Sequence, residues 1–214
     1  MDATRIIAIR HGETAWNVAT RIQGQLDIGL NETGRRQAQR LALALGSEPI
    51  NAIYASDLMR AWDTARAIAS ATGGTLHAEQ GLRERGFGLF QGKTYAEIEA
   101  TWPEQALRWR KRDPMWAPPG GGESLLAVRA RITRIASQLA ARHLGEQIVL
   151  VAHGGVMDAL YRIATGQELQ APRTWNLGNA AINRLLWTPE GLTLVGWSDT
   201  RHLDDDNALD ESST

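Results

Sequence analysis

The sequence of 214 residues contains no cysteine, and this absence excludes several classes of protein. Without thiols there is no disulfide framework, no thiolate-bound zinc or iron–sulfur cluster, and no cysteine nucleophile. Long hydrophobic runs are also missing, since no stretch approaches the roughly 18 apolar residues of a membrane-spanning helix. The apolar run Ile6–Ile9 is too short for the core of a signal peptide. We therefore expect a cytoplasmic protein with no membrane partner.

The chain also lacks an excess of charge of one sign, with 23 Lys and Arg against 24 Asp and Glu. A formal net charge of −1 gives no reason to expect nucleic-acid binding. Five acidic residues and no basic residue fall within 203–214, and without them residues 1–202 have a net charge of +4. We expect a single domain over 1–202, followed by an acidic, flexible tail over 203–214.

Short apolar runs alternate with helical patterns along the chain. Gln147–Ala152 has five apolar residues in a row and is expected to be a central strand. Further strands are predicted at Arg5–Arg10, Ala52–Ala55 and Thr75–His77, and a hairpin on the sheet edge at Ala181–Trp187 and Leu192–Trp197. Helices are predicted from Asn31 to Gly46, from Ser56 or Asp57 to Thr72, from Thr94 to a break near Pro103, and from Leu125 to about His143. This alternation predicts a doubly wound, mostly parallel α/β sheet.

Charged side chains follow the predicted strands at the edge where open α/β sheets bind ligands. They comprise two imidazoles, two guanidiniums and a carboxylate, from Arg10, His11, Arg60, Glu84 and His153. Each of these residues, taken singly, is more often structural than functional. Their joint placement at one edge of one sheet indicates a functional site.

This set of side chains suits phosphoryl transfer. Guanidinium groups match the oxygens of a phosphate, and a neutral imidazole can attack phosphorus and hold the phosphoryl group covalently. A protonated second imidazole would donate to a phosphoryl oxygen in the transition state. A neutral carboxyl group can protonate the leaving alkoxide and later activate water. Because Arg and His supply the positive charge, no metal or other cofactor is required.

Five blocks occur in order between Arg10 and Gly155. They are RHGETAWN (Arg10–Asn17), the run from Arg21-Ile22-Gln23-Gly24 to Gly34, SDLMRA (Ser56–Ala61), LRERGFG (Leu82–Gly88) and AHGG (Ala152–Gly155). Together they resemble the histidine phosphatase superfamily, which contains the cofactor-dependent phosphoglycerate mutases and related phosphatases. The resemblance implies a three-layer α/β/α fold with an antiparallel edge, and a phosphohistidine intermediate.

The resemblance also implies roles for particular residues. His11 would be the nucleophile and Glu84 the proton donor. The group that holds the phosphoryl would be Arg10, Arg60 and His153, and the residues lining the same pocket would include Asn17, Gln23, Gly24 and Gly154. Arg83 and Arg85 flank Glu84, and in an extended segment their side chains would point away from it.

The family contains both phosphatases and mutases, and the sequence favours a phosphatase acting on a small phosphorylated metabolite. Glu84 and His153 are only 69 residues apart, and the loop Pro118–Ser124 and Gln23 resemble those of compact phosphatases. The block Leu82–Gly88 looks mutase-like, so a phosphoglycerate mutase that uses 2,3-bisphosphoglycerate stays an alternative.

Two further alternatives receive less support. A non-catalytic protein that binds phospholigands would need neither the His11 nucleophile nor the Glu84 acid. A metal hydrolase would need paired ligands at zinc-site spacing, and no predicted helix has them. The substrate and the oligomeric state are left open by the sequence.

Tryptophan supplies eight of the thirteen aromatic residues. Trp102, Trp109 and Trp116 are spaced seven apart beside several basic residues. One interpretation is a helical stripe packed on the sheet. The other is a lid over the catalytic edge, with Arg108 and Trp109 in contact with the substrate.

Overall fold

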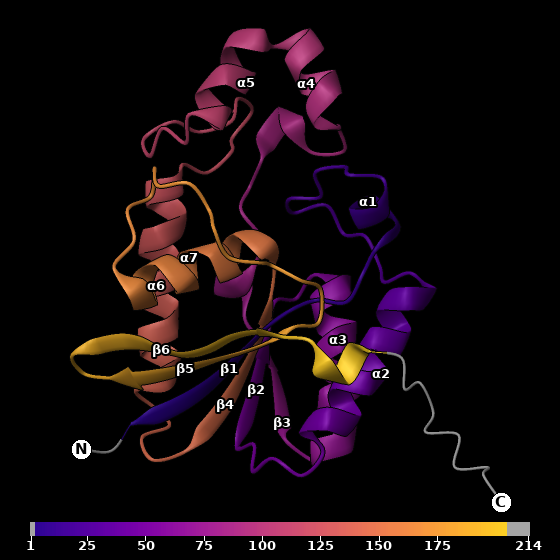
Figure 1. Cartoon of the computed structure of the whole chain (residues 1–214), viewed down its shortest axis with the longest axis vertical. Coiled ribbons are helices and arrows are strands. Elements are labelled where there is room, and N and C mark those ends of the chain that lie inside the picture. The colour runs from indigo at the N-terminus through magenta and orange to yellow at the C-terminus, as the bar shows by residue number, and fades with distance from the viewer. Residues whose placement is uncertain (1–2, 205–214) are drawn as a thin grey trace, which may run out of the picture.

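The computed structural model describes residues 3–204, which form a six-stranded sheet. Its strands are β1 (Thr4–Arg10), β2 (Ala52–Ala55), β3 (Thr75–Ala78), β4 (Gln147–Ala152), β5 (Ile182–Thr188) and β6 (Gly191–Asp199), in the order β3-β2-β4-β1-β5-β6. The first four run parallel, whereas β5 is antiparallel to β1, and β6 to β5. The predicted mostly parallel sheet with an antiparallel edge is confirmed (Figure 1).

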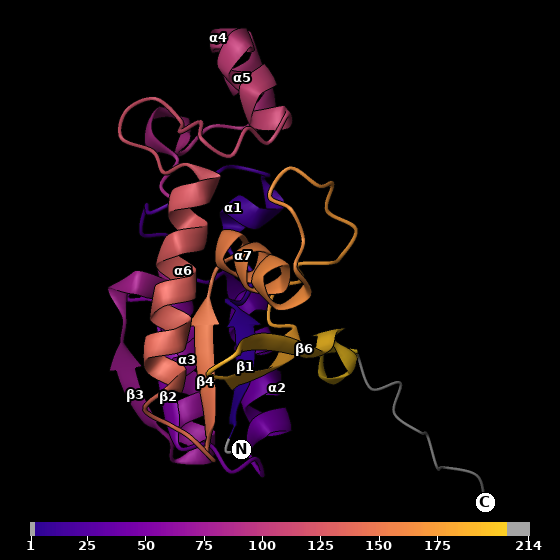
Figure 2. The same ribbon diagram turned by 90° about the vertical axis from the view of Figure 1, so that its left-hand side faces the viewer.

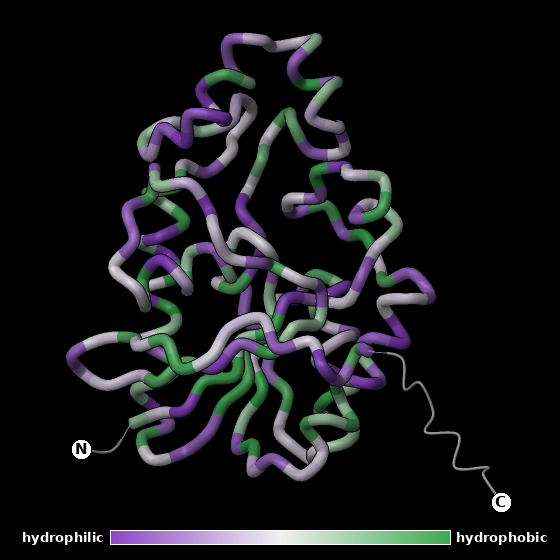
Figure 3. The backbone as a smooth tube through the Cα atoms, in the orientation of Figure 1, coloured by the Kyte–Doolittle hydropathy of each residue, from purple (hydrophilic) through white to green (hydrophobic). Residues whose placement is uncertain are grey.

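Helices cover both faces of this sheet. α2 (Glu32–Leu45) and α3 (Met59–Thr72) pack on one face, and α6 (Leu125–Ala140) and α7 (Gly154–Thr165) on the other (Figure 2). Because side chains alternate along a strand, Ile6 and Ala8 pack in the layer of α6 and α7, while Ile7 and Ile9 face α2 and α3. Hydrophobic stretches accordingly gather in the strands (Figure 3). The three-layer α/β/α architecture is confirmed.

The register of the central strands brings the two predicted site histidines together. Arg10 at the end of β1 lies opposite Ala152 at the end of β4. The next residue of each strand, His11 and His153, therefore emerges at the same edge, and their ring centroids are 5.2 Å apart. A shift of this register by one residue would move every alternating side chain to the wrong face.

A small helical cap lies beyond the carboxyl edge of the sheet, at the top of Figures 1 and 2. It consists of the 3-10 turn η2 (Gly88–Phe90), α4 (Tyr95–Thr101) and α5 (Pro103–Arg110). Its core is the buried ring of Phe90, on which Trp102, Trp109 and Trp116 pack at centroid distances of 5.7–5.9 Å.

The interpretation of the three tryptophans as a stripe packed on the sheet is therefore wrong, since their rings surround Phe90 in a separate cluster. They also do not form a helical stripe. Trp102 precedes α5 and Trp116 follows it, after the chain turns at Arg112 with a φ of 52°.

Most element boundaries agree with the predicted ones, and the exceptions have local causes. α3 begins at Met59 instead of Ser56 or Asp57, because Ser56 contacts His153 and Asp57 binds Arg83. α6 ends at Ala140, before the predicted His143. α7 has no counterpart among the predicted elements, since it opens with two glycines, which are poor helix formers.

The remaining segments are a short helix α1 (Ala15–Val18) and two 3-10 turns, η1 (Gln80–Leu82) and η3 (Arg201–Leu203). In η3, Leu203 packs against the layer of α2, and its carbonyl accepts a hydrogen bond from Arg40 Nη1 at 2.7 Å. The predicted acidic tail begins at this point, and its residues 205–214 lie outside the described range. Among the described residues, no helix has the length and hydrophobicity needed to cross a bilayer.

The loop after His11 crosses closely over the start of α2. A Cβ atom on Gly34 would lie 2.7 Å from the backbone nitrogen of Glu13 and closer still to its carbonyl oxygen. We expect Gly34→Ala to lower the free energy of unfolding by about 1–3 kcal/mol, the usual cost of overpacking. Helix propensity alone predicts that the substitution raises the free energy of unfolding by about 1 kcal/mol. The sign of the change in this free energy, measured by urea unfolding, therefore distinguishes overpacking from helix propensity.

Gly196→Ala is the matched control for this substitution, because a Cβ at that position has open space around it. A Gly34→Ala protein as stable as the parent would contradict the close approach of the two backbones.

Candidate active site

The His11 ring is buried just after the end of β1. The side chain is 2% exposed, and its backbone carbonyl accepts a hydrogen bond from Asn179 Nδ2 at 2.8 Å. Ring atom Nδ1 lies 2.7 Å from the carbonyl oxygen of Gly12, so Nδ1 is the protonated nitrogen and Nε2 has the lone pair. Burial lowers the pKa of His11 well below its ordinary value, and the charges of Arg10 and Arg60 lower it further. The ring is therefore a neutral nucleophile at neutral pH.

Arg60 points from α3 into the same site and is 1% exposed. Its Nη1 donates to the carbonyl of Leu26 at 2.8 Å and its Nη2 to that of Gly24 at 2.7 Å, while Nε has no partner among the described residues. Burial lowers the pKa of Arg60 to about 10, so the guanidinium stays charged at neutral pH. A buried cation that hydrogen-bonds only neutral carbonyls is well placed to bind an anion.

Arg10 supplies a second guanidinium from the end of β1. Its Nη1 donates to the carbonyl oxygen of Leu177, and its buried Nε has no partner among residues 3–204. Burial also lowers the pKa of this group, partly offset by the nearby charge of Glu84.

His153 stands at the N-terminus of α7 and is completely buried. Its Nε2 lies 2.8 Å from Ser56 Oγ, which also accepts a hydrogen bond from the backbone of Leu58 at 3.3 Å. The hydroxyl of Ser56 can donate to Nε2, and in that tautomer the proton of the neutral ring is on Nδ1, which has no partner among the described residues. Burial lowers the pKa of His153 well below its ordinary value, and the charge of Arg60 adds to this effect. His153 is thus a neutral donor in the free protein.

Glu84 reaches the site from the segment after η1. Both of its carboxylate oxygens lie 3.1 Å from the backbone nitrogen of Gly155, and Oε1 accepts a hydrogen bond from the backbone of Arg85 at 2.7 Å. A Cβ on Gly155 would collide with Oε1. The second glycine of the AHGG block is therefore required for the carboxyl group to lie beside the start of α7.

The three predicted loop residues lie near the same site but differ in their contacts. The carbonyl of Gly24 holds Arg60, and the buried Gln23 has an Oε1 atom with no partner among the described residues. Asn17 completes the capping box of α1 with Thr14, and its Oδ1 lies 3.5 Å from Asn179 Nδ2. Asn17 thus connects α1 to the backbone around His11.

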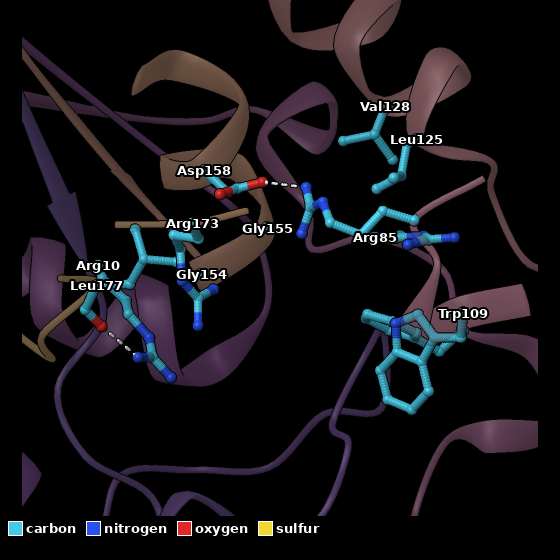
Figure 4. A pocket seen from close by; sticks show the side chains of 12 residues that line it. Arg10, Arg85, Trp109, Leu125, Val128, Gly154, Gly155, Asp158, Arg173 and Leu177 are labelled. Carbon is cyan, nitrogen blue, oxygen red and sulfur yellow. Dashed lines mark hydrogen bonds and ion pairs between the residues drawn. The ribbon is translucent and has the colours of Figure 1, made fainter. Parts of the chain in front are cut away.

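A cavity of about 420 Å³ adjoins these groups, and Gly154 and Trp109, which the sequence offered as substrate-binding residues, lie in its wall (Figure 4). Arg108 does not line this cavity, because it pairs with Asp113 at 2.9 Å on the exposed side of α5. The residues that line the cavity are Arg10, Arg85, Phe87, Trp109, Arg112, Leu125, Val128, Gly154, Gly155, Asp158, Arg173 and Leu177.

Several of these residues were not predicted from the sequence. Arg85 was expected to point away from the site, but residues 83–87 form no regular strand and Arg85 turns into the cavity wall. Arg173 and Asn179 come from the connection between α7 and β5, where no local pattern singles them out.

A metal site is not evident in the part of the chain that the structure describes. Within residues 3–204, no three His, Asp or Glu side chains are grouped so that they could hold a metal ion.

The site thus combines two buried neutral imidazoles with two guanidiniums at the carboxyl edge of a doubly wound sheet. Such a site defines a class of protein that binds a phosphoryl group and can transfer it to histidine. The match to a family model identifies the family. The chain belongs to the histidine phosphatase superfamily (branch 1), whose model matches residues 6–200.

Similar proteins include both mutase-like proteins and phosphatases. The chain is 38% identical to phosphoglycerate mutase-like protein 4 of Arabidopsis thaliana, over 98% of this chain and 91% of the relative. It is 38% identical to a metal-independent phosphoserine phosphatase of the same plant, over 94% and 84%.

A glucosyl-3-phosphoglycerate phosphatase of Mycobacterium tuberculosis is 39% identical, over 88% of this chain and 89% of the relative. A solved structure of the mycobacterial glucosyl-3-phosphoglycerate phosphatase superposes with a TM-score of 0.83 at 38% identity, covering 92% of this chain and all of that one. The protein is accordingly a phosphoric monoester hydrolase of the superfamily.

Proposed function

We propose that this phosphatase hydrolyses small phosphorylated metabolites through a phosphohistidine formed on His11, with Glu84 as general acid and base. The central observation in its support is the neutral, buried His11, whose Nδ1 is bound to Gly12 and whose Nε2 is free to attack. Arg10 and Arg60 flank it with donors that have no carboxylate partner within hydrogen-bonding distance among the described residues.

In the first step, His11 Nε2 attacks phosphorus and the ester P–O bond breaks. The leaving alkoxide takes a proton from Glu84. The carboxyl group of Glu84 must therefore be protonated when the substrate binds. Arg10 and Arg60 neutralise the phosphoryl oxygens, and His153 donates to one of them through Nδ1–H. His153 can do so as a neutral ring in the tautomer in which Ser56 donates to its Nε2.

In the second step, Glu84 takes a proton from a water molecule, and the resulting hydroxide equivalent attacks the phosphohistidine. The N–P bond breaks, inorganic phosphate leaves and His11 returns to its neutral form. The lowered pKa of His11 has a defined consequence for this cycle: the free ring stays unprotonated even when the pH falls somewhat below the usual pKa of histidine.

A panel of phosphorylated metabolites, assayed for released phosphate in the presence of EDTA, tests the proposal. We expect hydrolysis of several small monoesters at a rate that the chelator does not change, because the Arg10 and Arg60 side chains supply the positive charge at the site. Loss of activity in EDTA, with recovery on addition of a divalent metal, would contradict the scheme.

The same panel includes a mutase assay, with and without 2,3-bisphosphoglycerate. Faster interconversion of phosphoglycerates than phosphate release would replace the phosphatase proposal by the mutase alternative.

A further inference from the structure

The peptide group between Gly12 and Glu13 joins the nucleophile to a side chain on α2. Its carbonyl oxygen, that of Gly12, lies 2.7 Å from His11 Nδ1. Its N–H, that of Glu13, donates a hydrogen bond to Gln37 Oε1 at 2.8 Å. Because a backbone N–H can only donate, the amide oxygen of Gln37 must face it. A chain of contacts therefore runs from the His11 ring through one peptide group to Gln37.

The preceding peptide group, between His11 and Gly12, is also held by side chains. Its N–H donates to Thr64 Oγ1 at 3.0 Å, and its carbonyl accepts from Asn179 Nδ2 at 2.8 Å. Thr64 is completely buried on α3, and its hydroxyl donates to the carbonyl of Arg60 at 2.8 Å. Both peptide groups next to the His11 ring are thus bound from outside the loop, and neither can rotate without losing hydrogen bonds.

Two glycines allow the loop to lie directly on the start of α2. A Cβ on Gly12 would lie 2.5 Å from the carbonyl oxygen of Gly34, and a Cβ on Gly34 would lie 2.7 Å from the nitrogen of Glu13. Gln37 follows Gly34 by about one turn of α2, on the same side of the helix. The close approach of the two backbones therefore brings the N–H of Glu13 within reach of the Gln37 side chain.

The direction of these hydrogen bonds bears on the attack at phosphorus. An imidazole with its proton on Nδ1 has a lone pair on Nε2, whereas the other neutral tautomer has none there. As Nε2 of His11 bonds to phosphorus, positive charge develops on the ring, and the carbonyl of Gly12 stabilises it by accepting from Nδ1–H. A peptide oxygen becomes a better acceptor when the N–H of the same peptide group is itself hydrogen-bonded, so Gln37 strengthens this contact.

Gln37 lies outside the ligand cavity. It is half-buried on α2 and is not among the residues that line the cavity. The carboxylate of Glu13 also points elsewhere, since its Oε1 accepts from Asn31 Nδ2 at 2.8 Å at the start of α2. An effect of Gln37 on the reaction therefore has to pass through the backbone next to His11.

We infer that Gln37 is a positioning residue for the formation of the phosphohistidine. It holds the peptide group between Gly12 and Glu13 so that His11 keeps its proton on Nδ1 and presents the Nε2 lone pair to phosphorus. This inference rests on the proposed function, since it concerns the same nucleophile. It predicts an effect on the rate of the chemical step and on the tautomer of the ring, and none on the binding of a phosphoryl group.

Gln37→Met tests the inference, because methionine is similarly long and unbranched but has no oxygen that can accept from the N–H of Glu13. We expect the first-turnover release of p-nitrophenolate from p-nitrophenyl phosphate, which reports the phosphorylation of His11, to slow by about 3- to 10-fold, the scale of one net hydrogen bond. Competitive inhibition by inorganic phosphate should be unchanged, since the guanidiniums at the site are untouched.

Three variants accompany this measurement. Gln37→Glu keeps an acceptor oxygen at the same position and should restore the wild-type rate. Gln37→Asn withdraws the amide by one methylene and should slow the first turnover with a milder change of packing. Gln39→Met is the matched control, since Gln39 is exposed on the same helix and its replacement should leave the rate unchanged. Urea unfolding of each variant identifies a loss of rate caused by misfolding.

NMR of protein labelled with ¹⁵N-histidine gives a readout that does not depend on turnover. Protonated and unprotonated ring nitrogens have distinct chemical shifts, and the His11 signals are assigned by their absence from His11→Ala. We expect His11 of the wild-type protein to be protonated on Nδ1. In Gln37→Met the Nδ1–H signal should shift or lose intensity to an Nε2–H form, a change that loss of packing on α2 alone would not produce.

An unchanged first-turnover rate in folded Gln37→Met and Gln37→Asn would overturn the inference. So would a lowered rate with unchanged His11 ring signals, an equal loss of rate in Gln39→Met, or weaker inhibition by phosphate that accounts for the whole effect. Absence of a phosphoenzyme from the wild-type protein would instead contradict the proposed function itself.

Discussion

His11→Ala is expected to reduce kcat/KM on every substrate by at least about 10⁴-fold, the scale on which removal of a catalytic nucleophile acts. The reason is geometric, since the other imidazole at the site, His153, has its Nε2 occupied by Ser56. Rapid acid-free quenching with ³²P-labelled substrate should detect an acid-labile phosphoenzyme in the wild-type protein and none in His11→Ala.

His77→Ala is the matched control for this experiment. His77 lies on β3, where its ring stacks on Tyr54 away from the site, and its removal should leave both turnover and the phosphoenzyme intact. A His11→Ala protein that retains turnover, or a labelled phosphoenzyme in it, would rule out His11 as the nucleophile.

Glu84→Gln is expected to slow the release of poor leaving groups most. An alkyl alkoxide needs a proton as the P–O bond breaks, so hydrolysis of alkyl phosphates should fall by about 10²- to 10⁴-fold. p-Nitrophenolate leaves without a proton, so the phosphorylation of His11 by p-nitrophenyl phosphate, measured as a burst of p-nitrophenolate, should change far less. Both hydrogen bonds from the backbone of Gly155 and Arg85 can still be accepted by the amide oxygen.

Glu104→Gln provides a carboxylate control on the exposed first turn of α5 and should have no effect on either ester. Equal slowing of both leaving groups by Glu84→Gln would assign Glu84 to substrate binding and not to proton transfer.

The sequence by itself determined the layers of the fold and the side of the sheet on which the site lies. Five consecutive apolar residues predicted β4 as a central strand, and β4 is the strand between β2 and β1. The carboxyl ends of two parallel strands carry Arg10, His11 and His153. Their position at a common edge of the sheet could therefore be predicted from parallel topology alone. The AHGG block could be recognised as well, although the reason for its second glycine, the approach of Glu84, is visible only in space.

The tertiary structure decided which further side chains face the ligand cavity. Arg85 turns inward because residues 83–87 do not form the extended strand that alternation assumes, and Arg83 pairs with Asp57 instead. All three tryptophan rings pack on Phe90, and of the three Trp109 alone also lines the cavity, a difference that a spacing of seven does not reveal.

Asn179 and Arg173 reach the site from a connection with no regular structure, and Ser56 is recognisable as a partner of His153 only once β2 and β4 are paired. Periodicity records which face of an element is buried, and this information is local. The contacts that orient His11, bind the ring of His153 and line the cavity join residues as many as 168 positions apart, and they exist only when the layers are packed.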